Sequence, residues 1–458
     1  MEFLEIYPAI TVLPLLLMLV LVVVTRKVFE SIIVATALVF ILQDGTGFIT
    51  GFTYSMYDVF AEGTYPWILL VLTLFGGLIA LLIKSGGISA FRRLATKYMR
   101  SERSSLVFTW ILGVVLFIDD YINNLGIGPT VRDNTDRHKI SREQVGFTVC
   151  SMGTPVCSLV PLTAIAVFIF GIMQEYGISG DYSDMLAEYV RLIPFLFFPI
   201  SIIVIAFLLS IGVLPRVGVM RKYHKELAEG TYELTGAEKK QMEEMEDGID
   251  VSEAKGAMVD FALPVVLLVG AMLITSDLIL AVIVGLAVAF VLYVFRKKMS
   301  VTEFFEGFFR GVGDMIFILA VVLMTFVFVY GLENIGFSDY VIEVVTPLLT
   351  GGAIPVLTFI TVSVIAFLGV DYWAVMLLIA PIAIPLSDYF MVNPYMTMAA
   401  IVSGAVFGAI ACFFAENILM CAQSVQRPPV RVALAGLPYN ILGFVVSTIL
   451  YLIFGFAL

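Results

Sequence analysis

Long apolar stretches separated by short polar segments dominate the chain. A helix needs about 20 apolar residues to cross the hydrocarbon core of a bilayer. Ten stretches meet this length and predict full spans: 7–25, 28–48, 64–84, 144–173, 189–213, 258–275, 277–295, 312–333, 396–422 and 433–456. Two further apolar stretches, 105–131 and 351–390, are interrupted in the middle. The pattern therefore predicts an all-α polytopic membrane protein.

The basic residues give this predicted protein an orientation. Cytoplasmic loops of membrane proteins are enriched in Lys and Arg. All basic clusters of the chain lie in the cytoplasm only if each interrupted stretch begins and ends on the same side of the membrane. We therefore expect 105–131 to be a re-entrant hairpin from the cytoplasmic side and 351–390 to be one from the outer side. Both termini are then outside the cell membrane, and the acidic N-terminus argues against a cleavable signal.

The order of elements repeats within the chain. Residues 1–221 and 257–458 each contain five predicted spans and one hairpin, and the charged segment 222–256 separates them as a cytoplasmic linker. An odd number of spans inverts the second half relative to the first. Asp120-Tyr121 in the first hairpin is echoed by Asp371-Tyr372 in the second. Inverted-topology repeats with broken helices in matching positions are typical of secondary transporters.

Composition removes several classes of function. The chain is 60% hydrophobic and 14% charged with a net charge of -11, which excludes a soluble enzyme and a nucleic-acid-binding protein. The linker carries ten acidic and five basic residues, so nearly half of the net charge says little about partners. The four cysteines lie in apolar stretches and indicate neither disulfides nor a zinc site. We expect no cofactor, a small ion or molecule as the substrate, the lipid bilayer as surroundings, and either a monomer or a homodimer.

Polar side chains interrupt the first hairpin where lipid-depth sequence is expected. The run FIDDYINNLGIGPT places Asp119, Asp120, Asn123 and Asn124 in an apolar stretch. A charge at the centre of a bilayer costs several kcal/mol and usually marks an ion path or a proton relay. Carboxylate and amide oxygens are ligands suited to a hard cation. These four residues are the predicted site for Na+ or H+.

The rest of the predicted site comes from three other segments. The following span contains Ser151 and Thr154, close to helix-breaking glycine and proline residues. Asp371 lies in the second hairpin, and Glu416 with Asn417 lies deep in a late span. We expect these five residues to complete the site for the ion or for a small solute.

The motifs around these residues resemble a known family. DDYINNLGIGPTVRDNTDRHKISREQ followed by SMGTPVCSLVP, and later GVDYWAVMLLIAPIAIPL with SGAVFG, are similar to the NhaC family of Na+/H+ antiporters, within the ion transporter superfamily. The resemblance implies ten spans, two hairpins, inverted repeats and cation-coupled exchange. It assigns site roles to Asp119, Asp120, Asn123, Asn124, Ser151, Thr154 and Pro155.

The chain departs from the family in two places. Cys150 stands where the family usually has an acid, and AIACFFAENILMCAQS replaces a SPISD-like polar stretch. Relatives of the family also carry organic solutes such as malate, lactate or amino acids. Phe413, Phe414, Tyr372 and Trp373 would suit a larger solute. The alternative prediction is therefore a Na+- or H+-coupled transporter of a small organic solute, an amino acid or a carboxylate.

Two other classes of membrane protein fit the sequence less well. An intramembrane aspartyl protease would use Gly311-Val-Gly313-Asp314 with Tyr57-Asp58, but the predicted topology puts these segments on opposite faces. We therefore expect no enzymatic activity. A channel needs a continuous pore, whereas inverted halves favour alternating access.

Overall fold

The computed structural model describes residues 7–25, 27–61, 63–178, 185–236, 238, 256–347 and 350–457. Over these residues the chain is helical and contains no strand. Eight helices are long and apolar enough to cross a membrane, or up to ten if each of two bent helix pairs is one span. The prediction of an all-α polytopic membrane protein is confirmed.

The helices of the first half end before the linker. They are α2 (Leu13–Thr25), α3 (Val28–Asp44), α4 (Phe48–Ala61), α5 (Thr64–Lys84), α6 (Phe91–Tyr98), α7 (Glu102–Val115), α8 (Asp120–Arg137), α9 (Arg142–Cys150), α10 (Gly153–Leu159), α11 (Ala164–Glu175), α12 (Met185–Leu192) and α13 (Phe197–Ser210). The helices that follow are α14 (Gly218–Glu229), α16 (Met258–Thr275), α17 (Leu278–Phe295), α18 (Val301–Asn334), α19 (Phe337–Val345), α20 (Ile354–Phe367), α21 (Tyr372–Tyr389), α22 (Pro394–Ala411), α23 (Glu416–Val425) and α24 (Pro429–Ala457).

Several predicted spans are broken helices. The predicted span 144–173 consists of α9, α10 and α11, with a bend of 44° before α11. Pro161 has no backbone N–H to continue the helix, and the Thr163 hydroxyl accepts a hydrogen bond from the Ala166 N–H to start the next one. The predicted span 396–422 is likewise divided into α22 and α23. Each break leaves backbone groups that need other partners.

Equivalent helices of the two halves keep one spacing. Helices α20, α21, α22 and α23 begin 252 residues after α7, α8, α9 and α11 respectively. Helices α7 and α20 both have 14 residues, and α8 and α21 both have 18. This spacing corrects the expected echo by one position, because it pairs Asp119, not Asp120, with Asp371. Pro129 and Pro381 then also fall on equivalent positions of α8 and α21.

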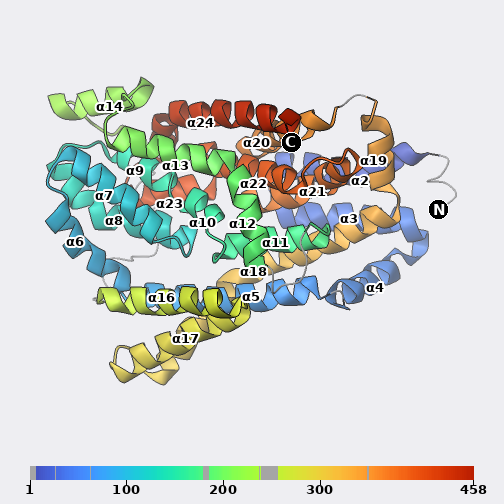
Figure 1. Ribbon diagram of the computed structural model, residues 1–458, viewed down its shortest axis with the longest axis horizontal. Coiled ribbons are helices and arrows are strands. Elements are labelled where there is room, and N and C mark those ends of the chain that lie inside the picture. The colour runs from blue at the N-terminus through green and yellow to red at the C-terminus, as the bar shows by residue number, and fades with distance from the viewer. Residues whose placement is uncertain are drawn as a thin grey trace.

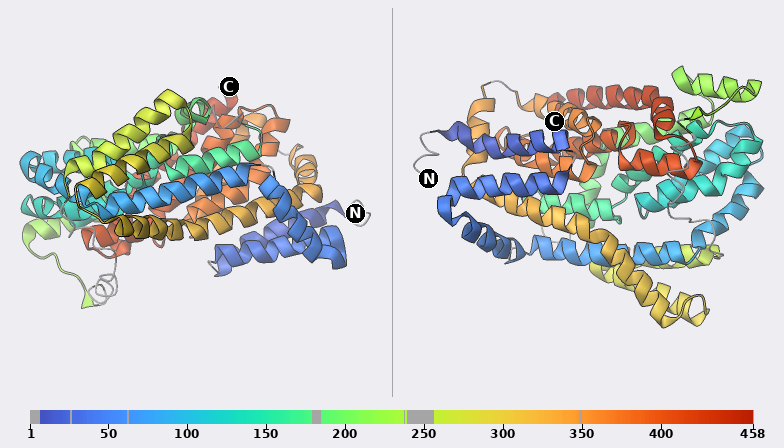
Figure 2. Two further views of the ribbon diagram at one scale, coloured as in Figure 1. Left: turned by 90° about the horizontal axis from the view of Figure 1, so that it is seen from below. Right: turned by 180° about the vertical axis from the view of Figure 1, so that it is seen from behind.

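The molecule is elongated, with most helices running along its length (Figure 1). Helices α2, α3, α4 and α19 gather at one end, and α6, α7 and α14 lie at the other (Figures 1 and 2). The hairpin of α16 and α17 packs against α5, and α17 projects from the body (Figure 2).

Helices α5 and α18 pack closely where a glycine of one helix faces a glycine of the other. A Cβ atom added to Gly311 would lie 2.1 Å from the carbonyl oxygen of Gly76. Gly311 therefore allows the two backbones to approach closely. The nearby Asp314 is exposed, and Asp58 accepts a hydrogen bond from Tyr330 at 3.2 Å. These contacts give the GVGD segment a packing role.

Candidate functional site

A cavity of about 190 Å³ lies beside the tip of the second hairpin. Asp371 and Tyr372 line it from the start of α21, and Phe414, Glu416 and Asn417 line it from the break between α22 and α23. The two helix breaks therefore bring the predicted second-half residues Asp371, Glu416 and Asn417 to one cavity.

Each hairpin tip places an aspartate at the start of a helix. Asp119 Oδ1 accepts a hydrogen bond from the Ile122 N–H at 3.1 Å and caps α8. Asp371 Oδ1 accepts hydrogen bonds from the N–H groups of Trp373 at 3.0 Å and Ala374 at 3.3 Å and caps α21. Free N–H groups and the helix dipole stabilise a negative charge at these positions.

Asp120 is the most enclosed carboxylate of the site, with 2% of its surface exposed. Its Oδ2 atom accepts hydrogen bonds from the Thr154 hydroxyl at 3.2 Å and from the Tyr372 hydroxyl at 3.1 Å. These partners come from α10 and from the opposite hairpin. Both are neutral, and an ionised carboxylate buried with neutral partners alone is costly. A bound cation or a proton would balance its charge.

Three side-chain hydrogen bonds join α8 to α23. The Asn124 amide donates to Asn417 Oδ1 at 2.8 Å, and the Cys421 thiol donates to Asn124 Oδ1 at 3.3 Å. The Tyr121 hydroxyl donates to Glu416 Oε1 at 2.5 Å. The first hairpin thus meets the residues of the cavity directly.

Two predicted site residues make only local polar contacts. The Asn123 amide group donates to the carbonyl oxygens of Gly113 at 2.7 Å and Leu116 at 3.3 Å, which holds the turn of the first hairpin. Its Oδ1 atom is buried and has no hydrogen-bond partner among the described residues. The Ser151 hydroxyl donates to the Phe147 carbonyl at 2.8 Å. Asn123 keeps an oxygen available for a ligand, whereas Ser151 is engaged within its own helix.

Sequence reasoning missed two members of the site. Tyr121 and Cys421 are not among the predicted site residues, although Tyr121 directly follows the two aspartates. A tyrosine between polar hairpin residues was a usable signal because its hydroxyl needs a partner when buried. Cys421 gave no such signal, because a cysteine in an apolar stretch is usually a packing residue.

The chemistry of the site is that of oxygen ligands. Its carboxylates are spread along the two hairpin tips and the α22–α23 break. The described part of the chain holds no group of three His, Cys, Asp or Glu placed around one metal position. Carboxylate, amide and hydroxyl oxygens together would have to bind a hard cation such as Na+.

Comparisons with known proteins agree with this chemistry. Residues 149–456 match the sequence profile of the Na+/H+ antiporter family. An uncharacterized protein of Haemophilus influenzae is 23% identical over 487 aligned positions, which cover 97% of this chain and 91% of the relative. The matched range starts after the first hairpin, at the end of α9, so the profile covers α10, α11 and the second half up to residue 456.

Two solved structures are similar in fold. One is the YdaH transporter of Alcanivorax borkumensis, with a TM-score of 0.58, 14% identity and 90% of each chain covered. The other is MtrF of Neisseria gonorrhoeae, described with a class of antimetabolite efflux pumps, with a TM-score of 0.55 and 16% identity. That alignment covers 91% of this chain and 85% of MtrF. The resemblance expected from the motifs is confirmed, and the fold is that of transporters.

Proposed function

Because the chain belongs to the Na+/H+ antiporter family, we propose that it is a secondary active transporter that exchanges Na+ and H+ by alternating access. The proposal depends on the position of Asp120. Its carboxylate is buried between the hydroxyls of Thr154 and Tyr372, where the two hairpins meet.

Exchange follows if Na+ and H+ compete for the carboxylate of Asp120. An ionised Asp120 can bind Na+, with the Thr154 hydroxyl and the unpartnered Asn123 oxygen as further ligands. A protonated Asp120 carries no charge to attract the cation. Na+ and H+ therefore bind in turn, and buried carboxylates are the usual proton carriers of transporters. Asp119, Asn124 and Asn417 would complete the polar surroundings, and Asp371 with Glu416 would attract the cation into the cavity.

Alternating access needs two arrangements of the same helices. The common spacing of 252 residues between α7, α8, α9, α11 and their counterparts supports an inverted repeat, and the hairpins would be re-entrant. Two similar halves can exchange conformations, which opens the site to each side in turn. A channel would instead need a pore that is continuous in a single state.

A second candidate function is cation-coupled transport of a small organic solute. The cavity of about 190 Å³ is larger than a bare ion requires, since water fills about 30 Å³ per molecule in the liquid. Phe414 and Tyr372 give it aromatic walls. The described lining residues include Asp371 and Glu416 and no basic side chain. This lining favours a solute with an ammonium group, such as an amino acid, over a bare carboxylate.

Purified protein in proteoliposomes tests the proposal. A Na+ gradient should drive proton movement, read by a pH-sensitive dye, and Asp120→Asn should reduce the rate by about tenfold or more because the exchangeable charge is lost. Asp314→Asn, which removes an exposed carboxylate from α18, is the matched control and should keep the rate. Unchanged coupling in Asp120→Asn would remove the first hairpin from the mechanism. Flux without coupling or trans-stimulation would indicate a channel.

A further inference from the structure

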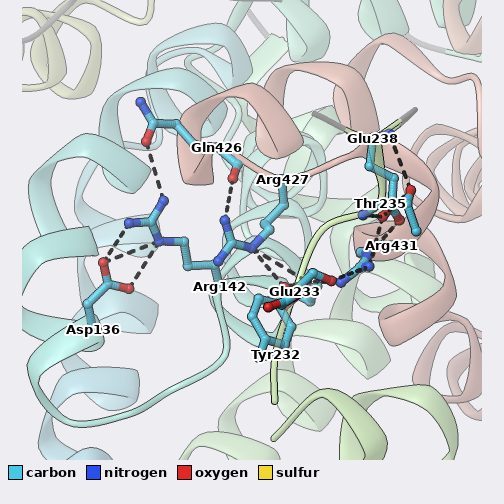
Figure 3. A network of polar contacts seen from close by, with 10 residues as sticks. Asp136, Arg142, Tyr232, Glu233, Thr235, Glu238, Gln426, Arg427 and Arg431 are labelled. Atoms are coloured by element: carbon cyan, nitrogen blue, oxygen red, sulfur yellow. Dashed lines mark hydrogen bonds and ion pairs between the residues drawn. The ribbon is translucent and has the colours of Figure 1, made fainter. Parts of the chain in front are cut away.

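The charged linker is partly folded against the transporter. After α14 the chain returns to the body, where Tyr232, Glu233 and Glu238 contact the start of α9, the start of α24 and the turn after α23 (Figure 3). Thr235 is hydrogen-bonded to Glu238. We name these four residues the strap. The expectation of a linker that only joins the two halves does not account for these contacts.

One side of the strap closes over a buried carboxylate. Glu143, in the first turn of α9, has a fully buried side chain. It accepts a hydrogen bond from the Tyr232 hydroxyl, and the Arg427 Nε atom lies 3.6 Å from it. Arg427 also donates to the Tyr232 hydroxyl at 2.8 Å and lies over the Tyr232 ring. Tyr232 therefore lies between Glu143 of α9 and Arg427, the second residue after α23.

The other side of the strap holds α24. Arg431 donates to both carboxylate oxygens of Glu238, at 2.5 and 2.8 Å, and to the Glu233 carbonyl at 3.0 Å. Glu238 also accepts from the Thr235 N–H and hydroxyl, each at 2.8 Å. The hydrogen bonds from Arg431 hold the pKa of Glu238 at about 2, below its usual value, so this carboxylate is ionised at neutral pH.

Figure 3 shows a third contact at the same end of α23. Arg142 forms an ion pair with Asp136 at 2.7 Å and donates to Gln426 Oε1 at 3.3 Å. Arg142, at the start of α9, thus connects the last turn of α8 to the residue that follows α23. The three arginines Arg142, Arg427 and Arg431 together fix α23 and α24 against α9.

Helix α23 links this end to the site. It has ten residues, a length of about 15 Å, with Glu416 and Asn417 in its first turn and Gln426 just after its last. Between them α23 lies tightly on α8, because a Cβ atom on Gly128 would be 2.4 Å from the Ser424 carbonyl oxygen. The interface between α8 and α23 is therefore closed from the site to the strap.

We propose that the strap is a latch, which holds α23 against α8 and α9 and must release before the site can open toward this end of the molecule. The inference rests on the proposed function, since only a transporter has to open its site to both sides. The latch is made of hydrogen bonds and ion pairs, which water can replace on release. Release of an apolar contact would instead expose apolar surface to water, which is unfavourable.

Amide hydrogen exchange tests the latch without any transport substrate. Glu238→Gln weakens the contact with Arg431, and Tyr232→Phe removes only the hydroxyl that reaches Glu143. Both should speed exchange in the first turn of α9 and the last turn of α23 by about threefold or more, since local opening becomes easier. Glu229→Gln is the matched control, because Glu229 lies on α14 and pairs with Lys225 at 3.6 Å outside the strap. Equal exchange in all three variants would overturn the proposal.

Transport by the same variants separates the latch from the proposed function. Na+-driven proton movement in proteoliposomes should be about twofold faster or more in both strap variants than in Glu229→Gln, since release becomes easier. Faster amide exchange with unchanged transport would overturn the role of the strap as a latch. Faster amide exchange in a protein that shows no Na+/H+ exchange would support the strap and contradict the proposed function.

Discussion

Two neighbouring aspartates of the first hairpin have different surroundings. Asp119 caps α8 through the Ile122 N–H, whereas Asp120 receives two hydroxyl donors from other helices. Asp119 therefore contributes in two ways: its hydrogen bond stabilises the start of α8, and its charge adds to the charge of the site. Substitutions of Asp119 can measure them one at a time.

Asp119→Ala and Asp119→Asn should differ in stability. Loss of an N-cap side chain costs about 1 kcal/mol, whereas Asn caps a helix about as well as Asp. We expect Asp119→Ala to lower the free energy of unfolding by about 1 kcal/mol and Asp119→Asn to leave it unchanged. Thermal unfolding of both proteins in one detergent measures the difference. Both should lose Na+-driven proton movement, because each removes a negative charge from the site. Equal melting temperatures would contradict the capping role.

At this scale the sequence predicted the polar residues better than their partners. Asp120 was recognisable because a carboxylate in lipid-depth sequence needs a function. Its contact with Tyr372 joins residues from opposite halves of the chain and depends on how the two hairpins meet. Ser151 resembled a ligand by its motif, but a serine in a helix can donate to the carbonyl of the preceding turn, as it does here to Phe147.

Among the helices, α8 and α23 approach each other closely beside the site. Gly128→Ala would place a methyl group 2.4 Å from the backbone oxygen of Ser424, so one helix must shift. Forcing extra volume into a packed interface typically costs about 1–3 kcal/mol. We expect this loss in the free energy of unfolding, together with reduced transport, because Asn417 would move away from Asn124.

Gly313→Ala is the control for that substitution. It has the same chemical change within a helix, but nothing lies within 4 Å of the added Cβ atom. Ala favours a helix over Gly by about 1 kcal/mol, so Gly313→Ala should be neutral or stabilising. Thermal unfolding and proteoliposome transport of the two variants measure both effects. A Gly128→Ala protein as stable and active as Gly313→Ala would contradict the close α8–α23 contact.

Helix breaks were partly readable from the sequence. Gly153, Pro155 and Pro161 indicated the interruption of the span 144–173, and the structure divides it into three helices. The predicted span 312–333 is only part of a longer helix, because α18 runs without a break from Val301 to Asn334. Glycines such as Gly307 and Gly311 weaken a helix in isolation, but here they allow α18 to pack against α5.

At the scale of the whole molecule, the two halves are related by a constant spacing along the chain. The common spacing of 252 residues extends to two turns, where Lys139 and Met391 both adopt the left-handed backbone conformation, at φ angles of 54°. The order of spans in the sequence predicted the repeat. The residue-by-residue alignment of the two halves became clear only from the helix bounds. The orientation of the two halves follows from the basic clusters alone and stays a prediction.

Single cysteines at these two turns test the orientation. Lys139 and Met391 are exposed, and the four native cysteines are buried. In intact cells, a membrane-impermeant thiol reagent should label Met391→Cys. It should label Lys139→Cys only after the membrane is permeabilised, because inverted halves put equivalent turns on opposite faces. The unsubstituted protein should remain unlabelled and sets the background. Labelling of both cysteines from one side would contradict the inverted repeat, and labelling with the sides exchanged would keep the repeat and reverse the predicted position of the termini.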